Sequence, residues 1–160
     1  MLDSKREQEV WQRVMDLSAQ APACCKMPKT DTVTAEQIME KLMGELEDVM
    51  VYEALSCRVR GDARRCLLML AAGERRHYEK LETVYYLMTG KKPCPDRPKR
   101  PCIACTNEEL RERYIHEVKG AEKYKALAEK AGSFSKVLLE LAHDEECHAQ
   151  KVLGVLQACL

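Results

Sequence analysis

Apolar residues recur every three or four positions along four long segments of the chain, a spacing that predicts four amphipathic α-helices. In the first two segments the positions expected to face inward are Ile38, Leu42, Glu45, Val49, Tyr52, Ser56, Val59, Leu67, Leu70, Glu74, His77, Leu81, Val84 and Met88. In the last two they are Leu110, Tyr114, Glu117, Ala121, Tyr124, Ala128, Leu138, Leu141, Glu145, His148, Val152, Val155 and Cys159. Glutamates and histidines are the side chains that interrupt these largely apolar faces.

Polar capping residues and glycines predict where these helices begin and end. The candidate caps are Thr34 with Gln37, Asp62, Thr106 with Glu109, and Ser133, and the candidate stops are Gly61, Gly90 and Gly132. A further amphipathic helix is predicted ahead of the four, with an apolar side formed by Val10, Trp11, Val14 and Leu17. We therefore expect an all-α chain with an N-terminal helix and linker in residues 1–33 and a four-helix bundle in residues 34–160.

The four bundle segments form two copies of one pattern, each with a Glu on its first helix and a Glu-x-x-His on its second. The two copies consist of Glu45 with Glu74 and His77, and of Glu117 with Glu145 and His148. The offset is 72 positions from Glu45 to Glu117 and 71 from Glu74 to Glu145, so one residue in a turn accounts for the difference. Two such hairpins facing each other would place four carboxylates and two imidazoles in one bundle core, which is the ligand set of a di-iron carboxylate site.

The expected burial of these four glutamates is a second argument for a bound metal ion. A charged Glu on a buried face costs several kcal/mol unless it is paired or binds a metal ion. Four glutamates carry a charge of −4, which two divalent cations would neutralise. We expect two iron ions, and manganese suits the same ligands.

The connection between the second and third bundle helices contains four prolines, so residues 91–105 are expected to be extended. At about 3.1 Å per residue this segment would span roughly 45 Å, whereas a helix of about 27 residues is roughly 40 Å long. The connection can therefore run the length of the bundle, which is typical of a ferritin-like four-helix bundle with one long crossover.

Composition narrows the class of partner. The 160 residues include 26 Lys and Arg against 26 Asp and Glu, so no charge excess favours nucleic acid or an anionic membrane. No apolar run reaches the roughly 18 residues of a membrane span. The N-terminus, with Asp3, Glu7 and Glu9, lacks the apolar region of a signal peptide. We expect a cytoplasmic protein.

With these motifs, residues 34–160 resemble the rubrerythrin branch of the ferritin-like superfamily, without the rubredoxin domain that commonly ends those proteins. The resemblance implies that six side chains bind two iron ions, namely Glu45, Glu74, His77, Glu117, Glu145 and His148. It also implies that Glu74 and Glu145 bridge the two ions and that Glu45 and Glu117 each bind one. Rubrerythrins carry a further Glu one turn after the third-helix ligand, where this chain has Gly120, and Asp48 is a candidate for an extra carboxylate.

The resemblance implies a non-haem di-iron oxidoreductase that reduces hydrogen peroxide with electrons from an external donor protein such as a rubredoxin. The oxidant would be hydrogen peroxide or oxygen, and we expect a homodimer. Three alternatives stay open, namely a ferritin-like ferroxidase that stores iron, an oxygen-activating hydroxylase, and a metal or redox sensor.

Two tyrosines and the cysteines add further candidates. Tyr52 and Tyr124 lie two turns from Glu45 and Glu117 on the same helix faces, where each hydroxyl could bond a ligand carboxylate. Nine cysteines are an odd number, which argues against a disulfide framework. Four are predicted to be small core residues, namely Cys57, Cys66, Cys147 and Cys159.

The other five cysteines lie in segments expected to be non-helical, namely Cys24, Cys25, Cys94, Cys102 and Cys105. Cys102-x-x-Cys105 stands just before a predicted helix start, which would lower a thiol pKa. Three readings remain for these residues: unlinked thiols, a redox dithiol at Cys102 and Cys105, or a second metal site in which the thiolates bind zinc or iron.

Overall fold

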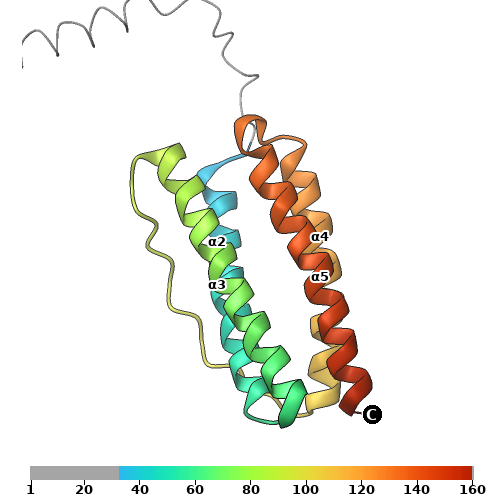
Figure 1. Cartoon of the computed structure of the whole chain (residues 1–160). Helices are drawn as coiled ribbons and strands as arrows, with labels where there is room; N and C mark the ends of the chain where they lie inside the picture. The colour runs from blue at the N-terminus through green and yellow to red at the C-terminus, as the bar shows by residue number, and fades with distance from the viewer. Residues whose placement is uncertain (1–32, 160) are drawn as a thin grey trace, which may run out of the picture. The chain divides into compact units, whose positions relative to one another are not determined.

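The computed structural model describes residues 33–159, which form four α-helices and one short 3-10 helix (Figure 1). The helices are α2 (Ala35–Ser56), α3 (Gly61–Thr89), α4 (Thr106–Ala128) and α5 (Ser135–Cys159), with the 3-10 helix η1 at Gly132–Phe134. The prediction of an all-α bundle is confirmed for this part of the chain. The predicted N-terminal helix, together with Cys24 and Cys25, lies outside the described residues.

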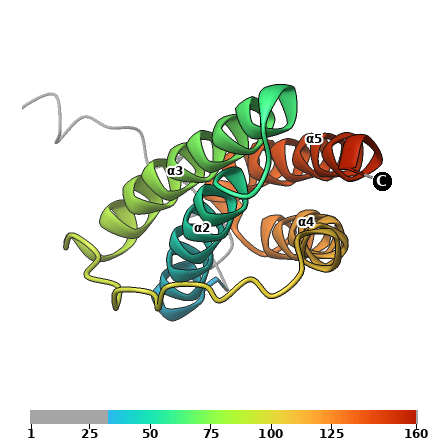
Figure 2. The ribbon, with the colours of Figure 1, turned by 90° about the horizontal axis from the view of Figure 1, so that it is seen from below.

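The four helices pair as two hairpins. Helix α2 packs along α3, and α4 packs along α5, while α3 and α5 also contact each other. Figure 1 shows that α3 and α4 run in the same direction, because the chain returns along the bundle between them. Figure 2, which looks down the bundle, places this returning segment beside α2.

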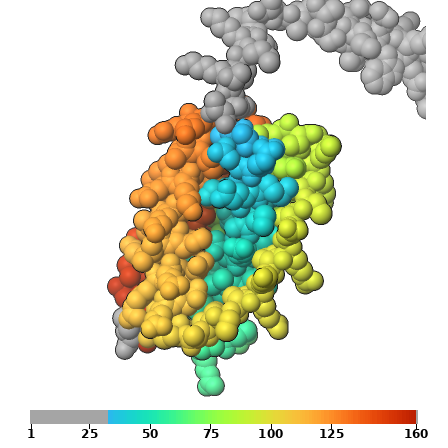
Figure 3. Space-filling view, turned by 180° about the vertical axis from the view of Figure 1, so that it is seen from behind, coloured from blue at the N-terminus to red at the C-terminus, as the bar shows by residue number. Residues whose placement is uncertain are grey.

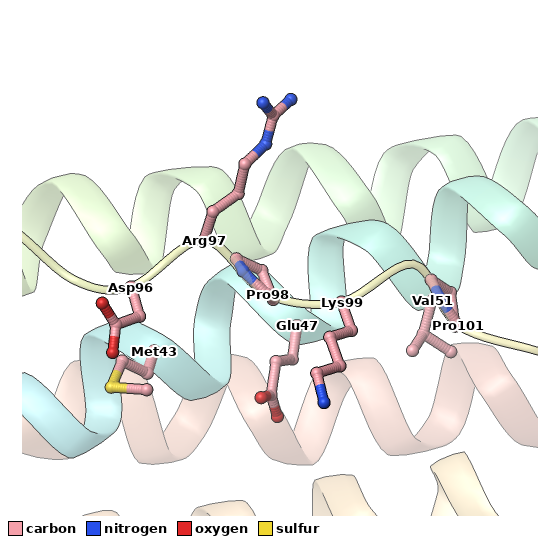
Figure 4. Close-up of a pocket in the computed structure, with 8 residues that line it drawn as sticks. All are labelled: Met43, Glu47, Val51, Asp96, Arg97, Pro98, Lys99 and Pro101. Carbon is pink, nitrogen blue, oxygen red and sulfur yellow. The ribbon is translucent and has the colours of Figure 1, made fainter.

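The returning segment, residues 91–105, contains no helix and lies against α2. Met43, Glu47 and Val51 of α2 line a shallow groove with Pro98 and Pro101 of this segment (Figure 4). In the space-filling view of Figure 3 the segment crosses the surface next to α2 and leads into α4. Proline suits this path because it fixes an extended backbone and has no N–H group that would need a partner.

The buried interior consists of two apolar clusters with a polar layer between them. Each helix supplies apolar side chains to both clusters and ionisable ones to the layer. On α3, for example, Leu67 and Leu70 belong to one cluster, Leu81 and Val84 belong to the other, and Glu74 lies between. Most of the inward positions predicted from the sequence are thereby confirmed, and Leu42, Leu70, Leu110 and Leu141 have no solvent exposure. The exceptions are only half-buried, namely Val59, Met88, Tyr114 and Cys159.

The predicted helix ends were partly correct. Thr34 and Gln37 form the expected capping box, and Gly90 ends α3 with a φ of 69° in the left-handed region. The other predicted helix ends were wrong. Helix α2 ends at Ser56 and not at Gly61, and α4 ends at Ala128 and not at Gly132. Helix α3 already begins at Gly61, so Asp62 lies inside the first turn and pairs with Arg65.

Thr106 also lies inside its helix instead of capping it. Helix α4 begins at Thr106 itself, after Cys105, and the Thr106 hydroxyl accepts a 3.0 Å hydrogen bond from Arg58 Nε. Ser133 lies within η1, and α5 begins two residues later. Hydrophobic spacing therefore located the helices, whereas single capping residues did not fix three of the four starts.

None of the helices in the described part of the chain is both long enough and apolar enough to cross a membrane.

Candidate metal centre

The polar layer at mid-bundle contains all six predicted ligand side chains. None of them is more than 5% exposed, and they are Glu45 from α2, Glu74 and His77 from α3, Glu117 from α4, and Glu145 and His148 from α5. Each residue interrupts an apolar stripe that faces inward, so packing of the leucines on either side places it in the interior. The two imidazole rings lie 5.0 Å apart, centroid to centroid.

Glu74 lies between the two histidines. Its Oε2 is 2.9 Å from Nδ1 of His77, and its Oε1 is 2.8 Å from Nδ1 of His148. One carboxylate thus presents one oxygen to each imidazole. This arrangement is compatible with a carboxylate that bridges two metal ions.

The other glutamates divide the layer into two halves around Glu74. Near His77, the Nδ1 atom is 3.3 Å from Glu45 Oε2 and 3.4 Å from Glu145 Oε1. Near His148, the Nδ1 atom is 3.8 Å from Glu117 Oε2. We call Glu45 with His77 the His77 half-site, and Glu117 with His148 the His148 half-site.

Two tyrosines connect the hairpins by hydrogen bonds to these glutamates. Tyr124 on α4 donates to Oε1 of Glu45 on α2, and Tyr52 on α2 donates to Oε1 of Glu117 on α4. Both phenols are buried. Because each bond occupies one carboxylate oxygen, it leaves the Oε2 atom of the same glutamate facing the histidines.

Several polar atoms in the layer have no hydrogen-bond partner within the protein. They are Glu45 Oε2, both carboxylate oxygens of Glu74, Glu117 Oε2, and Nδ1 of His77 and of His148. An unsatisfied buried polar atom costs about 1–3 kcal/mol. Carboxylate oxygens and imidazole nitrogens are also the donor atoms that iron, manganese and zinc accept.

This buried group of Glu and His residues could therefore hold a metal ion. One atom from each of Glu74, His77, Glu145 and His148 lies within 4.8 Å of the others. Among the residues that the structure describes, no second cluster of His, Cys, Asp and Glu has such geometry.

Without metal, burial shifts the pKa values of the glutamates strongly. Burial raises the pKa of Glu45 and of Glu74 to about 7, against the opposing effect of His77. Burial and the adjacent Glu145 raise the pKa of Glu117 to about 9, and burial also raises the pKa of Glu145. The metal-free layer therefore retains protons at pH values where an exposed Glu is ionised.

The two histidines respond in opposite directions. Burial alone would lower the pKa of His77, but the adjacent carboxylates of Glu145, Glu45 and Glu74 outweigh burial and raise the pKa to about 12. Burial and the positive charge of His77 lower the pKa of His148 to about 4, although Glu117 opposes them. In the metal-free protein the layer thus contains one cationic and one neutral imidazole near neutral pH.

Asp48 does not join the cluster as an extra carboxylate. Its Oδ1 accepts a 2.6 Å hydrogen bond from Arg113 Nη1, and its Oδ2 lies 3.0 Å from His116 Nε2. Both partners are on α4, so Asp48 joins the two hairpins beside the layer. Sequence reasoning missed Arg113. Arg113 precedes Glu117 by four residues, and this spacing places both residues on the same face of the helix.

The cysteines differ most from their predicted places. Cys57 and Cys147 are exposed, so the prediction that they are core residues was wrong. Cys66 and Cys159 are half-buried and pack against one of the two apolar clusters, so the prediction is correct in part for these two. Cys94, Cys102 and Cys105 are exposed free thiols. No thiolate metal site forms among the seven cysteines that the structure describes, and the redox reading of Cys102 and Cys105 stays a prediction.

We expect Tyr124→Phe and Tyr52→Phe each to weaken metal binding by about 10–100-fold, because groups that orient a ligand carboxylate contribute on that scale. Binding of Mn(II) can be measured by isothermal titration calorimetry. Tyr114→Phe is the matched control, since Tyr114 is a half-buried phenol of α4 outside the polar layer. Wild-type affinity in both variants would show that these hydrogen bonds do not orient ligands.

No protein-family model matches the chain, and no curated protein or solved structure matches it either, so the assignment of this site rests on its own geometry.

Proposed function

We propose that this bundle is a ferritin-like di-iron protein that reduces hydrogen peroxide with electrons from an external donor. The observation that carries the proposal is the position of Glu74, which presents one oxygen to Nδ1 of each histidine. On either side of it, Glu45 and Glu117 each offer one unpartnered oxygen. The likeness to rubrerythrins in ligand pattern and long crossover supports the choice of iron and of peroxide.

The positions of the six side chains indicate which metal ion each of them would bind. Glu74 and Glu145 would be shared by both ions, while Glu45 with His77 and Glu117 with His148 would each complete one half-site. Iron would supply the electrons that cleave the O–O bond of peroxide. Reduction of one peroxide to two waters consumes two electrons and two protons, so a donor outside the bundle has to restore the electrons.

The surrounding side chains hold this ligand set and limit the access of water. Tyr52 and Tyr124 fix the orientation of Glu117 and Glu45, so only one oxygen of each remains for a metal. The apolar clusters above and below the layer contain leucines with no solvent exposure. A water-poor site strengthens the electrostatic interaction between carboxylates and cations.

Stopped-flow mixing tests the proposed oxidant. Protein loaded anaerobically with Fe(II) is mixed separately with hydrogen peroxide and with oxygen, and oxidation is followed by absorbance. We expect a second-order rate constant at least about tenfold larger for peroxide, which corresponds to roughly 1.4 kcal/mol in the barrier. Glu74→Gln, treated in the same way, should lack the fast phase.

The same measurement separates peroxide reduction from iron storage. A storage ferroxidase would react faster with oxygen, oxidise many Fe(II) per chain and retain the product in a large hollow particle. That combination of results, read together with the particle mass from light scattering, would contradict the peroxidase proposal.

A further inference from the structure

The two hairpins repeat one pattern, but they differ at the residue directly before each Glu-x-x-His. Glu74 and Glu145 correspond at an offset of 71, and the same offset relates Gly73 to Asp144. The two positions therefore lie at equivalent places on α3 and α5. One of them carries a carboxylate and the other carries no side chain.

Asp144 lies behind His77, on the opposite side of the imidazole from the polar layer. Its Oδ2 is 3.5 Å from His77 Nε2 and 3.3 Å from Lys80 Nζ. His77 thus presents Nδ1 to the glutamates and Nε2 to a carboxylate that a lysine holds. Such a partner fixes the orientation of a ligating imidazole and makes it a stronger electron donor.

Gly73 stands in the corresponding place behind His148. A Cβ atom at Gly73 would lie 2.5 Å from His148 Nε2 and 2.6 Å from Cε1, which is far inside van der Waals contact. The ring of His148 thus occupies the space that any side chain at position 73 would need. The nearest other side-chain atom to that Cβ position is Arg76 Nη2, at 3.8 Å, which is a cation and cannot accept a hydrogen bond.

From this difference we infer that the two half-sites are unequal: the His77 half-site, backed by Asp144, binds its metal ion more tightly than the His148 half-site, backed by Gly73. The inference rests on the proposed two-metal centre and adds which half fills first. Asp144 and Gly73 act as positioning residues, since they act only through the histidines. A carboxylate partner of a ligating histidine typically changes metal affinity by about 10–100-fold, which sets the expected difference between the two steps.

Titration of the metal-free protein with Mn(II) tests the inference. Mn(II) suits carboxylate and imidazole ligands and has little affinity for thiols, so the exposed cysteines should not contribute. Free Mn(II) is counted by electron paramagnetic resonance and the heats by calorimetry. We expect two binding steps whose dissociation constants differ by about 10–100-fold.

Asp144→Ala should weaken the tighter step by about 10–100-fold and leave the two steps similar. The Asp144 side chain is 45% exposed, so its loss should leave the fold intact. Glu140→Ala is the matched control, because Glu140 is another exposed acid of α5 that pairs with Lys80 but does not face His77. The control should keep both steps.

Gly73→Ala should act on the other step. The added methyl group must displace His148, so the weaker step should lose at least about tenfold in affinity while the tighter step changes by less than about threefold. Gly44→Ala is the matched control, since Gly44 also directly precedes a candidate ligand, Glu45, and a Cβ there meets nothing within 4 Å. Circular dichroism confirms that each variant is folded.

Two equal binding steps in the wild type would overturn the inference, as would an equal loss in both steps with Gly73→Ala or an unchanged tight step with Asp144→Ala. Failure of the proposed two-metal centre itself would give another result, which can be told apart from these. If the folded wild-type protein binds no Mn(II) and no Fe(II), there is no two-metal centre for the residues to divide.

Discussion

Replacing Glu74 with Gln is expected to weaken binding of both metal ions at once, by more than about 100-fold each, while the bundle stays folded. Each oxygen of Glu74 lies within 2.9 Å of a different histidine, so the change removes a charged ligand from both half-sites. Gln has nearly the same volume as Glu, so the layer stays filled. Metal content after anaerobic reconstitution with Fe(II) measures the loss.

Glu79→Gln is the control, because Glu79 is an exposed acid on the same helix. It should bind metal as the wild type does. Glu74→Ala provides a second variant that cannot ligate through an amide oxygen. If either Glu74 variant still binds two ions tightly, Glu74 is not a shared ligand and the division of the layer into two half-sites is wrong.

The metal-free protein is expected to lose thermal stability as the pH rises from about 6 to 9. Glu45, Glu74 and Glu117 have folded-state pKa values of about 7, 7 and 9, all above the unfolded value of 4.5. The folded state therefore binds more protons than the unfolded state in this range, so the free energy of unfolding falls with rising pH. We expect the melting temperature to drop by at least about 10 °C, since each kcal/mol corresponds to roughly 2–4 °C in a chain of this size.

The histidines modify this profile without reversing it. The raised pKa of His77 adds stability at low pH that is lost as the pH rises, and so has the same sign as the glutamates. The lowered pKa of His148 has the opposite sign, but only between about 4 and 6.5. The decline should therefore be steepest above about pH 6.5.

Two further measurements by differential scanning calorimetry test whether the buried carboxylates cause this loss of stability. Saturating Mn(II) should raise the melting temperature most at high pH, because the ions bind the ionised carboxylates of the folded state. Glu117→Gln should make the metal-free protein more stable at pH 8 and flatten its profile. A metal-free wild type that melts at the same temperature at pH 6 and pH 9 would contradict a buried acidic layer.

The main architecture and the polar layer could be predicted because both follow from one periodicity. Leu42 and Val49 must face inward, and a helical repeat then carries Glu45 inward with them. The same argument on each helix brings all six side chains into one layer. The burial of the repeated Glu and Glu-x-x-His residues can thus be predicted directly from the sequence.

Contacts between the hairpins could not be predicted in this way. Whether Tyr52 reaches Glu45 on its own helix or Glu117 on α4 depends on how closely the hairpins approach, and only the structure shows the bond to Glu117. The pairing of Asp48 with Arg113 depends on the same packing. The prediction that Cys57 is buried was wrong for another reason. Cys57 lies just beyond the end of α2, where the helical period no longer determines which side chains are buried.

The segment of residues 91–105 has a consequence for symmetry. In a dimer of two identical hairpins, every substitution would occur twice, once in each half of the interface. Here one continuous chain joins two hairpins of different sequence, so a residue can change on one side alone. Gly73 and Asp144 are such a pair, and a pseudo-twofold centre can thereby contain two chemically different positions within a single subunit.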